Sequence, residues 1–296
     1  MSAGFKILMG ICLYKMRWQV KKLYKSNKFC DILEINKGIT AIIGSGGKTS
    51  LMMRLAEELC GHGRTVICTT THIMRPEGIP TVETEEELKA EFERQERAAA
   101  AEHGRQDERG RRPVPVCIGT PAEDARKLTV PSVSFERLTE LAEYVIVEAD
   151  GARRMPLKCH AVHEPVIPGN TDRVIWVTGL SGIGKKVSEA VHRPELFKEY
   201  TGLGPDDTVT AEAVAKATAA EAGRNIVTDA PSENIMLFIN QADTEADTEK
   251  ALALAKELRT VLAADRAISG KEAEGRIPDI RIFAGSVKNG HIRVEK

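Results

Sequence analysis

Apolar residues in this chain gather in short continuous runs rich in valine and isoleucine, and they seldom alternate with polar residues. Continuous hydrophobicity is typical of a strand that is buried on both faces of a sheet. We therefore expect strands over residues 39–43, 65–70, 114–118, 144–149, 173–179, 234–240 and 279–285.

Segments with apolar residues at helical spacing separate most of these runs, for example residues 51–60, 135–144, 211–220 and 248–263. Strands that alternate with helices favour a sheet whose strands are mostly parallel and whose two faces are covered by helices. The pattern therefore predicts an α/β fold, a three-layer sandwich around a mostly parallel sheet of about seven strands.

The first 36 residues differ from the rest of the chain. About ten apolar residues near the start are followed by a basic stretch. The apolar run is too short for a membrane span, and the segment lacks the features of a signal peptide. We expect a helical extension over residues 1–36, packed on the domain, with a basic amphipathic helix on a membrane or partner as the alternative. Residues 37–296 are expected to form a single domain.

A charged insertion spans residues 83–112 of that domain. It has almost no apolar content after Phe92 and mixes acidic and basic residues throughout. This composition predicts an exposed helix that ends in a mobile loop.

Charge and cysteine content narrow the classes of function. The 42 basic and 43 acidic residues leave a net charge of −1, which provides no overall positive field for nucleic acid. The six cysteines form no CxxC pair, and a chain of this length needs no disulfides to fold. We expect reduced thiols, a cytoplasmic location, no transmembrane segment and no nucleic-acid partner.

The sequence GSGGKTS follows the first expected strand and opens a helix. Glycines allow successive backbone amides to turn toward a phosphate, the helix start adds its positive dipole end, and a lysine adds charge. Lys48 is expected to face solvent and to neutralise the β and γ phosphates, and Thr49 to hold Mg²⁺. The expected nucleotide-binding residues here are Gly44, Ser45, Gly46, Gly47, Lys48, Thr49 and Ser50.

This loop departs from the usual GxxxxGK[ST] pattern, because Ile42 occupies the position of the first glycine. The shorter G-x-x-G-K-T form also occurs in Mur-type ligases, and a plain glycine-rich turn is the simpler alternative. The segment 179–186, GLSGIGKK, matches the glycine and lysine spacing better. It lacks the hydroxyl for a metal, and Pro194 limits any helix behind it, so we expect a loop near the site.

Two acids end the strand at residues 144–149. Glu148 and Asp150 alternate, so both side chains should lie on one side, where a carboxylate can bind Mg²⁺ or orient water. We expect Lys48, Glu148 and Asp150 to be the catalytic residues, and Thr49 and Asp150 to be the metal ligands. Solvated acids at a strand end are the alternative.

Three other segments carry weaker signals. The sequence NQAD resembles the NKxD guanine-recognition element, with Asp243 accepting from the base and Asn240 bracing the loop, although Gln241 replaces its lysine. FAGSVKNG ends the last expected strand, where GTP-binding proteins with an NKxD element place a base-contacting loop. Residues 69–72 follow a strand at the usual place of a switch segment. In KCHAVHEP, metal binding is possible in principle, but local hydrogen bonding is the expected role.

Several segments together resemble one family, the YqeC-type selenium cofactor biosynthesis proteins. They are GSGGKTSLM, TTTHI, VEADGARRMPLK running into HEPVIP, GLSGIGK with VHRPE behind it, and INQAD. The resemblance spans roughly residues 38–290. It implies a P-loop nucleoside-triphosphatase fold and a role as an accessory protein in maturing a selenium-dependent molybdenum hydroxylase. The VEADG segment also looks like the matching strand end of nickel-insertion GTPases.

We therefore expect an accessory protein that binds, and hydrolyses with Mg²⁺, either GTP or ATP, with a molybdenum hydroxylase or another cofactor-assembly protein as its partner. One alternative is an ATP-dependent ligase or kinase that acts on a small substrate. Another is a non-catalytic scaffold that senses the nucleotide.

Overall fold

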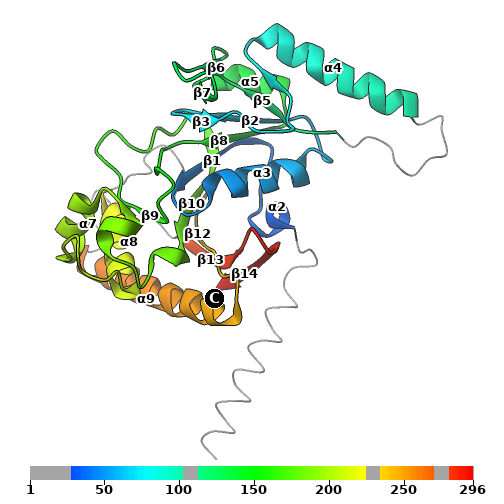
Figure 1. Ribbon diagram of the computed structural model, residues 1–296. Helices are drawn as coiled ribbons and strands as arrows, with labels where there is room; N and C mark the ends of the chain where they lie inside the picture. The colour runs from blue at the N-terminus through cyan, green and yellow to red at the C-terminus, as the bar shows by residue number, and fades with distance from the viewer. Residues whose placement is uncertain (1–27, 103–112, 225–233, 270–279, 296) are drawn as a thin grey trace, which may run out of the picture.

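The structure is a computed structural model that describes residues 28–102, 113–224, 234–269 and 280–295 (Figure 1). Most of the expected N-terminal extension, Cys12 and the end of the charged insertion lie outside these ranges. Among the helices within them, none combines the length and the apolarity that crossing a lipid bilayer requires.

The described residues form an α/β fold around a nine-stranded sheet in which every strand except β14 is parallel to its neighbour. In spatial order the strands are β14 (His291–Glu295), β13 (Arg281–Ser286), β12 (Ile235–Asn240), β10 (Thr171–Gly179), β1 (Gly38–Gly44), β8 (Tyr144–Glu148), β2 (Thr65–Thr69), β5 (Val116–Ile118) and β4 (Thr81–Val82).

The sheet is larger than the seven strands that the sequence predicts. All seven expected segments are strands of this sheet, and the two additional strands, β4 and β14, lie at its two edges. β4 is only two residues long, too short to leave a hydrophobic pattern. β14 pairs antiparallel with β13 and its sequence alternates polar and apolar residues, so it lacks the continuous apolar run that marks the other strands.

Helices cover both faces of the sheet, as the alternation along β1 shows. Ile42 packs with α2 (Phe29–Ile32) and α3 (Lys48–Leu59) on one face. Its neighbours Ala41 and Ile43 point to the other face, where α8 (Ala211–Gly223) and α9 (Glu245–Ser269) pack. Next to them on that face, α4 (Glu85–Glu102) and α5 (Phe135–Leu141) cover β2, β5 and β8. Figure 1 shows α3 and α9 on opposite sides of the sheet.

The charged insertion forms α4, whose Leu88 and Phe92 are buried against the sheet while most of its other residues face solvent. The remaining elements are short: β3 (Ile73–Met74), β6 (Thr120–Pro121), β7 (Lys127–Thr129), β9 (Leu157–Lys158), the 3-10 helix η1 (Leu180–Gly182), α6 (Val187–Ala190), β11 (Val191–His192) and α7 (Pro194–Thr201). β3, β7 and β6 form one small sheet, and β9 pairs with β11.

The register of the central strands brings four strand ends together. Ile42 of β1 lies beside Glu148 of β8, Gly44 lies beside Val177 of β10, and Gly179 lies beside Asn240 of β12. The loops that follow β1, β8, β10 and β12 therefore meet at the carboxyl edge of the sheet, where α/β proteins bind their ligands.

Candidate functional site

The loop from Gly44 to Lys48, called here the glycine loop, joins β1 to the start of α3. Gly44, Gly46 and Gly47 all have positive φ, at 88°, 83° and 119°. A Cβ on Gly46 would lie 2.3 Å from the Cα of Gly179, and one on Gly47 would lie 2.3 Å from the Asn240 Nδ2. Only glycine fits these two positions, because both the backbone conformation and the close approach of the neighbouring loops exclude a side chain.

Lys48 is buried, contrary to the expectation that it faces solvent. Its ammonium donates to the carbonyl oxygen of Gly44 at 2.7 Å and lies 3.0 Å from Asp150 Oδ1 and 3.7 Å from Glu148 Oε1. The side chain is only 4% exposed, because these two carboxylates draw it back over the glycine loop. Sequence spacing could not show this, since the acids lie about 100 residues away in the chain.

The hydroxyl groups in the glycine loop and in the first turn of α3 have separate partners. Thr49, in the first turn of α3, donates to Glu148 Oε2 at 2.7 Å, and Ser45 donates to the carbonyl oxygen of Pro156 at 3.0 Å. Ser50 is exposed on the next position of the helix. Thr49 and Ser50 are both exposed, and of the two it is Thr49 whose hydroxyl contacts a carboxylate.

Glu148 and Asp150 converge on Lys48, yet their surroundings shift their pKa values in opposite directions. Burial raises the pKa of Glu148, and Lys48 and Thr49 offset this only in part. Burial also acts to raise the pKa of Asp150, but Lys48, His160 and Lys158 outweigh it and hold that pKa below the ordinary value. Asp150 therefore remains ionised at neutral pH, whereas Glu148 takes up a proton more readily.

A buried chain of ionisable side chains continues from Asp150 to α8. Asp150 Oδ2 accepts from the Gly44 amide at 2.8 Å, lies 3.1 Å from the Lys158 ammonium and is bonded to His160 Nε2 at 2.7 Å. The Nδ1 of His160 lies 3.2 Å from both carboxylate oxygens of Glu221, which also accepts from its backbone amide. Burial acts to lower the pKa of His160, but the two carboxylates outweigh it and raise that pKa to about 8.

Sequence reasoning missed two members of this chain, Lys158 and Glu221. Lys158 has a fully buried side chain between Asp150 and Glu164, whose Oε2 lies 2.8 Å away. Glu221 is 1% exposed and interrupts the alanine-rich pattern of α8. An acid within a buried alanine stripe is the signal that could have identified it, since charged residues are rarely buried without a partner.

The donor atoms near Thr49 are suited to a hard cation. They are the hydroxyl of Thr49 and the carboxylates of Glu148 and Asp150, all oxygen ligands of the kind that Mg²⁺ prefers. Asp150 Oδ1 is buried and accepts no hydrogen bond from the described residues, although the Lys48 ammonium lies 3.0 Å away. Lys48 balances the charge of this oxygen in the structure, so a metal ion bound there would replace the ammonium as its partner.

The segment KCHAVHEP gives no comparable donor set. His160 is bonded to Asp150 and Glu221, and Glu164 lies 3.0 Å from the Arg193 guanidinium. No group of three or more histidine, cysteine or acidic side chains within the described ranges is arranged to hold a metal. The cysteines in those ranges are free thiols. Local bonding is the role that the contacts show.

The NQAD segment contacts the glycine loop directly. Asn240 Nδ2 donates to the carbonyl oxygen of Gly46 at 2.8 Å, and its Oδ1 accepts from the amide of Val287 at 3.1 Å. Asp243 Oδ1 accepts from the Ser286 hydroxyl at 2.5 Å. Asn240 therefore connects the glycine loop to the loop after β13, and Asp243 lies beside that same loop.

The GLSGIGKK segment lies against the glycine loop without sharing its geometry. Gly179 packs on Gly46, and the amide of Ser181 donates to Gln241 Oε1 at 3.0 Å. The helix that follows, α6, has four residues, and α7 begins at Pro194. Lys185 is exposed. The segment is a neighbour of the glycine loop, at the place the sequence predicts.

The threonines after β2 are held by the backbone of the same edge. Thr69 is buried and donates to the carbonyl oxygen of Glu148 at 2.8 Å, and Thr70 donates to that of Val166 at 2.7 Å. His72 is exposed. Residues 69–72 therefore lie beside the strand that carries the two acids.

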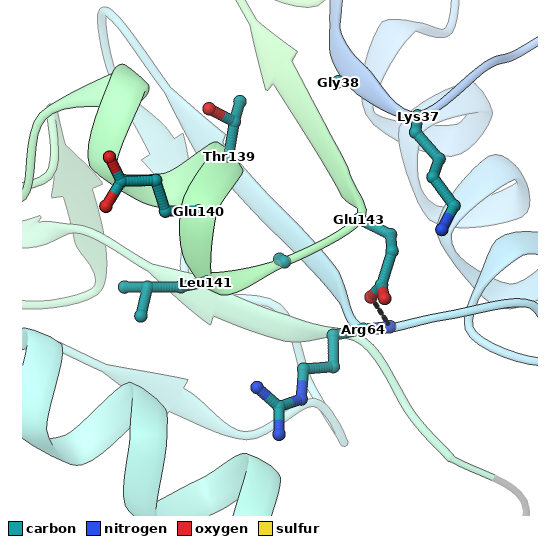
Figure 2. Close-up of a pocket in the computed structure, with 8 residues that line it drawn as sticks. Lys37, Gly38, Arg64, Thr139, Glu140, Leu141 and Glu143 are labelled. Carbon is teal, nitrogen blue, oxygen red and sulfur yellow. Dashed lines mark hydrogen bonds between the residues drawn. The ribbon is translucent and has the colours of Figure 1, made fainter.

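A pocket of about 250 Å³ lies at the amino edge of the sheet, at the opposite end of the strands from the glycine loop (Figure 2). Figure 2 shows Lys37, Arg64 and Glu143 around it, with the Glu143 carboxylate accepting from the Arg64 amide at 2.8 Å. None of the residues that the sequence predicts for the site lines this pocket. The arrangement of charges and amides favours the carboxyl edge as the site.

Comparison with known proteins places this edge in a recognised family region. The family model described as "YqeC protein" matches residues 40–195, more than half of the chain. A protein of Escherichia coli K12, described as "Uncharacterized protein YqeC", is 35% identical over 177 residues, which are 58% of this chain and 63% of that relative. No solved structure matches the chain. The family region includes the glycine loop and the two acids but ends before Asn240.

Proposed function

The chain belongs to the YqeC protein family, and from that membership and the geometry of the carboxyl edge we propose that it binds a nucleoside triphosphate with Mg²⁺ and hydrolyses it. We further propose that it acts as an accessory protein in the maturation of a selenium- and molybdenum-containing hydroxylase cofactor. The fold we propose for the family is of the P-loop nucleoside-triphosphatase type.

One observation carries the proposal: Lys48, Glu148 and Asp150 converge directly behind a loop of three positive-φ glycines at the start of α3. Backbone amides in such a loop and the positive end of the helix attract phosphate. A lysine held by two acids beside this loop provides both a phosphate contact and the acids that a metal requires. None of these features alone is specific, but their combination is typical of phosphoryl chemistry.

The residues of the glycine loop take distinct roles in this proposal. The amides of Gly44 and Ser45 already donate to Asp150 Oδ2 and to the carbonyl oxygen of Val177. The amides of Gly46 and Gly47 therefore bind the phosphates, and Lys48 neutralises their charge. In the structure Lys48 is already paired with the acids, so the phosphates must compete with those carboxylates for its ammonium. The competition favours a nucleotide that arrives with a cation, because the cation takes over the carboxylates.

The two acids have different roles in this proposal because their ionisation differs. Asp150 stays ionised, so it and the Thr49 hydroxyl hold Mg²⁺. Mg²⁺ bound there supplies positive charge to the transferring phosphoryl group. Glu148, whose pKa is raised by burial, orients the attacking water and is suited to accept its proton.

Hydrolysis is tested by measuring phosphate release from GTP and ATP with Mg²⁺, on the wild type and on Asp150→Asn. We expect the variant to lower turnover roughly 10- to 100-fold and to leave nucleotide affinity within about threefold, because the loop amides and Lys48 still hold the phosphates. Asp206→Asn is the control, since that carboxylate is exposed and pairs only with the exposed Lys186 among the described residues.

The same assay separates the rival functions. Phosphate release without an added acceptor supports the hydrolase, whereas release that requires an acceptor indicates a ligase or kinase. Tight binding without turnover indicates a nucleotide-sensing scaffold. Equal losses of turnover and affinity in Asp150→Asn would place Asp150 in the binding scaffold, and unchanged turnover would point to Glu148 as the metal ligand.

The maturation role is tested in the host by deletion of the gene. We expect a selenium-dependent hydroxylase to lose its activity while its polypeptide still accumulates. Normal hydroxylase activity would contradict the role. Loss of every molybdenum enzyme together would indicate a general supply of molybdenum cofactor instead.

A further inference from the structure

The turn from Ala152 to Met155 begins two residues after Asp150. The amide of Met155 donates to the carbonyl oxygen of Ala152 at 2.9 Å, which closes a four-residue turn. Its two central residues, Arg153 and Arg154, have φ of 47° and 62°. Positive φ at both central positions is the geometry of a type I′ turn, which normally takes asparagine and glycine.

Two arginines are a costly choice for this turn. The left-handed region brings Cβ too close to the following carbonyl oxygen in any residue except glycine. Strained residues of this kind persist where the surrounding structure holds them, and they cluster at functional sites. The turn is held at both ends: Lys158 Nζ donates to the carbonyl oxygen of Gly151, and the carbonyl oxygen of Pro156 accepts from Ser45 and from the amide of Gly179.

The charges of this turn have no partner among the residues that the structure describes. Arg153 and Arg154 are exposed, and neither guanidinium makes an ion pair or a hydrogen bond with a residue that the structure describes. Burial lowers the pKa of His192, and Arg193, Lys158 and Arg153 lower it further despite Glu164. Arg153 therefore adds positive charge to a side of the site where Lys158 and Arg193 already lie, although these two are paired with Asp150 and Glu164.

The position of the turn indicates which anion its arginines would bind. Its chain leaves from Asp150, which bonds the amide of Gly44, and returns at Pro156, which accepts from Ser45. Arg153 is three residues from Asp150, so its backbone lies within roughly 11 Å of that residue. The turn thus leaves from and returns to the glycine loop, so an arginine side chain on it can reach a phosphate bound there. A guanidinium binds a phosphate through two parallel hydrogen bonds, which a lysine does not offer.

We propose that Arg153 and Arg154 bind the terminal phosphate of the nucleotide, so that the protein distinguishes a triphosphate from a diphosphate through this turn. The inference rests on the proposed function, because it requires the nucleotide to lie in the glycine loop. It assigns to the strained turn the task of detecting the γ-phosphate.

Calorimetric titration tests the inference with non-hydrolysable GTP and ATP analogues and with GDP and ADP, all with Mg²⁺. For each base we compare the affinity ratio of triphosphate to diphosphate. In Arg153→Gln or Arg154→Gln this ratio should fall about tenfold, and roughly 100-fold when both are changed, while diphosphate affinity stays within about threefold. Lys185→Gln removes an exposed charge from the neighbouring GLSGIGKK segment and should leave the ratio unchanged.

A second variant excludes misfolding as the cause of a lower affinity ratio of triphosphate to diphosphate. Arg153→Asn combined with Arg154→Gly supplies the residues that a type I′ turn prefers, so the midpoint of thermal unfolding should rise. The same variant should lose the preference for triphosphate. A gain in stability together with a loss of discrimination is the expected result, because the arginines are retained for the ligand and not for the fold.

The outcomes separate this inference from the proposed function. If the wild type binds neither triphosphate nor diphosphate, both fail. If the wild type binds both and the arginine variants keep its affinity ratio, only this inference fails. An equal loss of triphosphate and diphosphate affinity would overturn it as well, because that result indicates general attraction.

Discussion

Replacing Lys48 with methionine should destabilise the protein even without a nucleotide. The substitution nearly conserves volume, so the main change is the loss of a buried charge between two buried carboxylates. At 3.0 Å and 3.7 Å, and with an effective dielectric constant of 20, the two attractions amount to about 5.5 and about 4.5 kcal/mol. The substitution also removes the cost of taking the lysine out of water on folding, which offsets several kcal/mol of this sum.

What remains after Lys48 is removed sets the net effect. Asp150 keeps Lys158 and His160 as partners, and Glu148 can take up a proton because burial already raises its pKa. We therefore expect a loss of about 3 kcal/mol in the free energy of unfolding, near the lower end of the cost of breaking a buried pair.

Urea unfolding at pH 7 in the absence of nucleotide measures this loss. The matched control is Lys185→Met, which removes an exposed lysine and should change the free energy of unfolding by less than about 0.5 kcal/mol. A Lys48→Met protein as stable as the wild type and the control would refute the reasoning, because the contacts of Lys48 would then contribute nothing net. Combining Lys48→Met with Asp150→Asn should cost less than the sum of the two single changes.

Three further predictions concern the surroundings of the glycine loop. The pKa of His160 is raised from 6.5 to about 8, so protonated His160 should add about 2 kcal/mol to the free energy of unfolding below pH 6.5. This contribution should disappear as the pH rises through 8. Parallel profiles of stability against pH for the wild type and His160→Gln would contradict the prediction. Gly46→Ala should destabilise more than Gly184→Ala, since both have positive φ but only Gly46 has neighbours within reach of a Cβ; equal unfolding midpoints would mean that the backbone alone matters. If Asp243 reads guanine, competition binding should favour GTP over ATP by a few kcal/mol, and Asp243→Asn should shift the preference toward XTP; equal affinities for ATP and GTP with no gain for XTP would remove the guanine interpretation.

The hydrophobic pattern predicted the central strands well because parallel strands are buried on both faces. Short continuous runs such as residues 144–149 fit few structures besides a buried strand when helices lie between them. The same criterion missed β4 and β14, since a two-residue strand has no pattern and an edge strand that alternates does not look buried. The order of the strands in the sheet is a matter of tertiary structure and was not predicted.

For the candidate site, too, the sequence predicted local features better than long-range contacts. The glycine spacing predicted a turn of the backbone after the first strand, and all three glycines there have positive φ. The burial of Lys48 depends on acids from a distant strand, and the bond between His160 and Glu221 depends on a helix 61 residues further along the chain. Contacts of this kind arise only when the sheet and its helices are assembled.

The left-handed pair Arg153 and Arg154 illustrates a third kind of limit. The residues are visible in the sequence, and the resemblance to the family included the segment that contains them. Their positive φ contradicts the ordinary preference of arginine, so no local rule predicts it. Local preference fails here at the edge of the proposed site, which is where such failures are expected.

The most direct test of the account is the crystal structure of the protein with a non-hydrolysable triphosphate and Mg²⁺. We expect the phosphates on the amides of Gly46 and Gly47 in the glycine loop, with the metal ion contacted by Thr49 and Asp150. Phosphates bound instead at the GLSGIGKK segment, or in the pocket at the amino edge of the sheet, would contradict the central claim that the glycine loop is the nucleotide site.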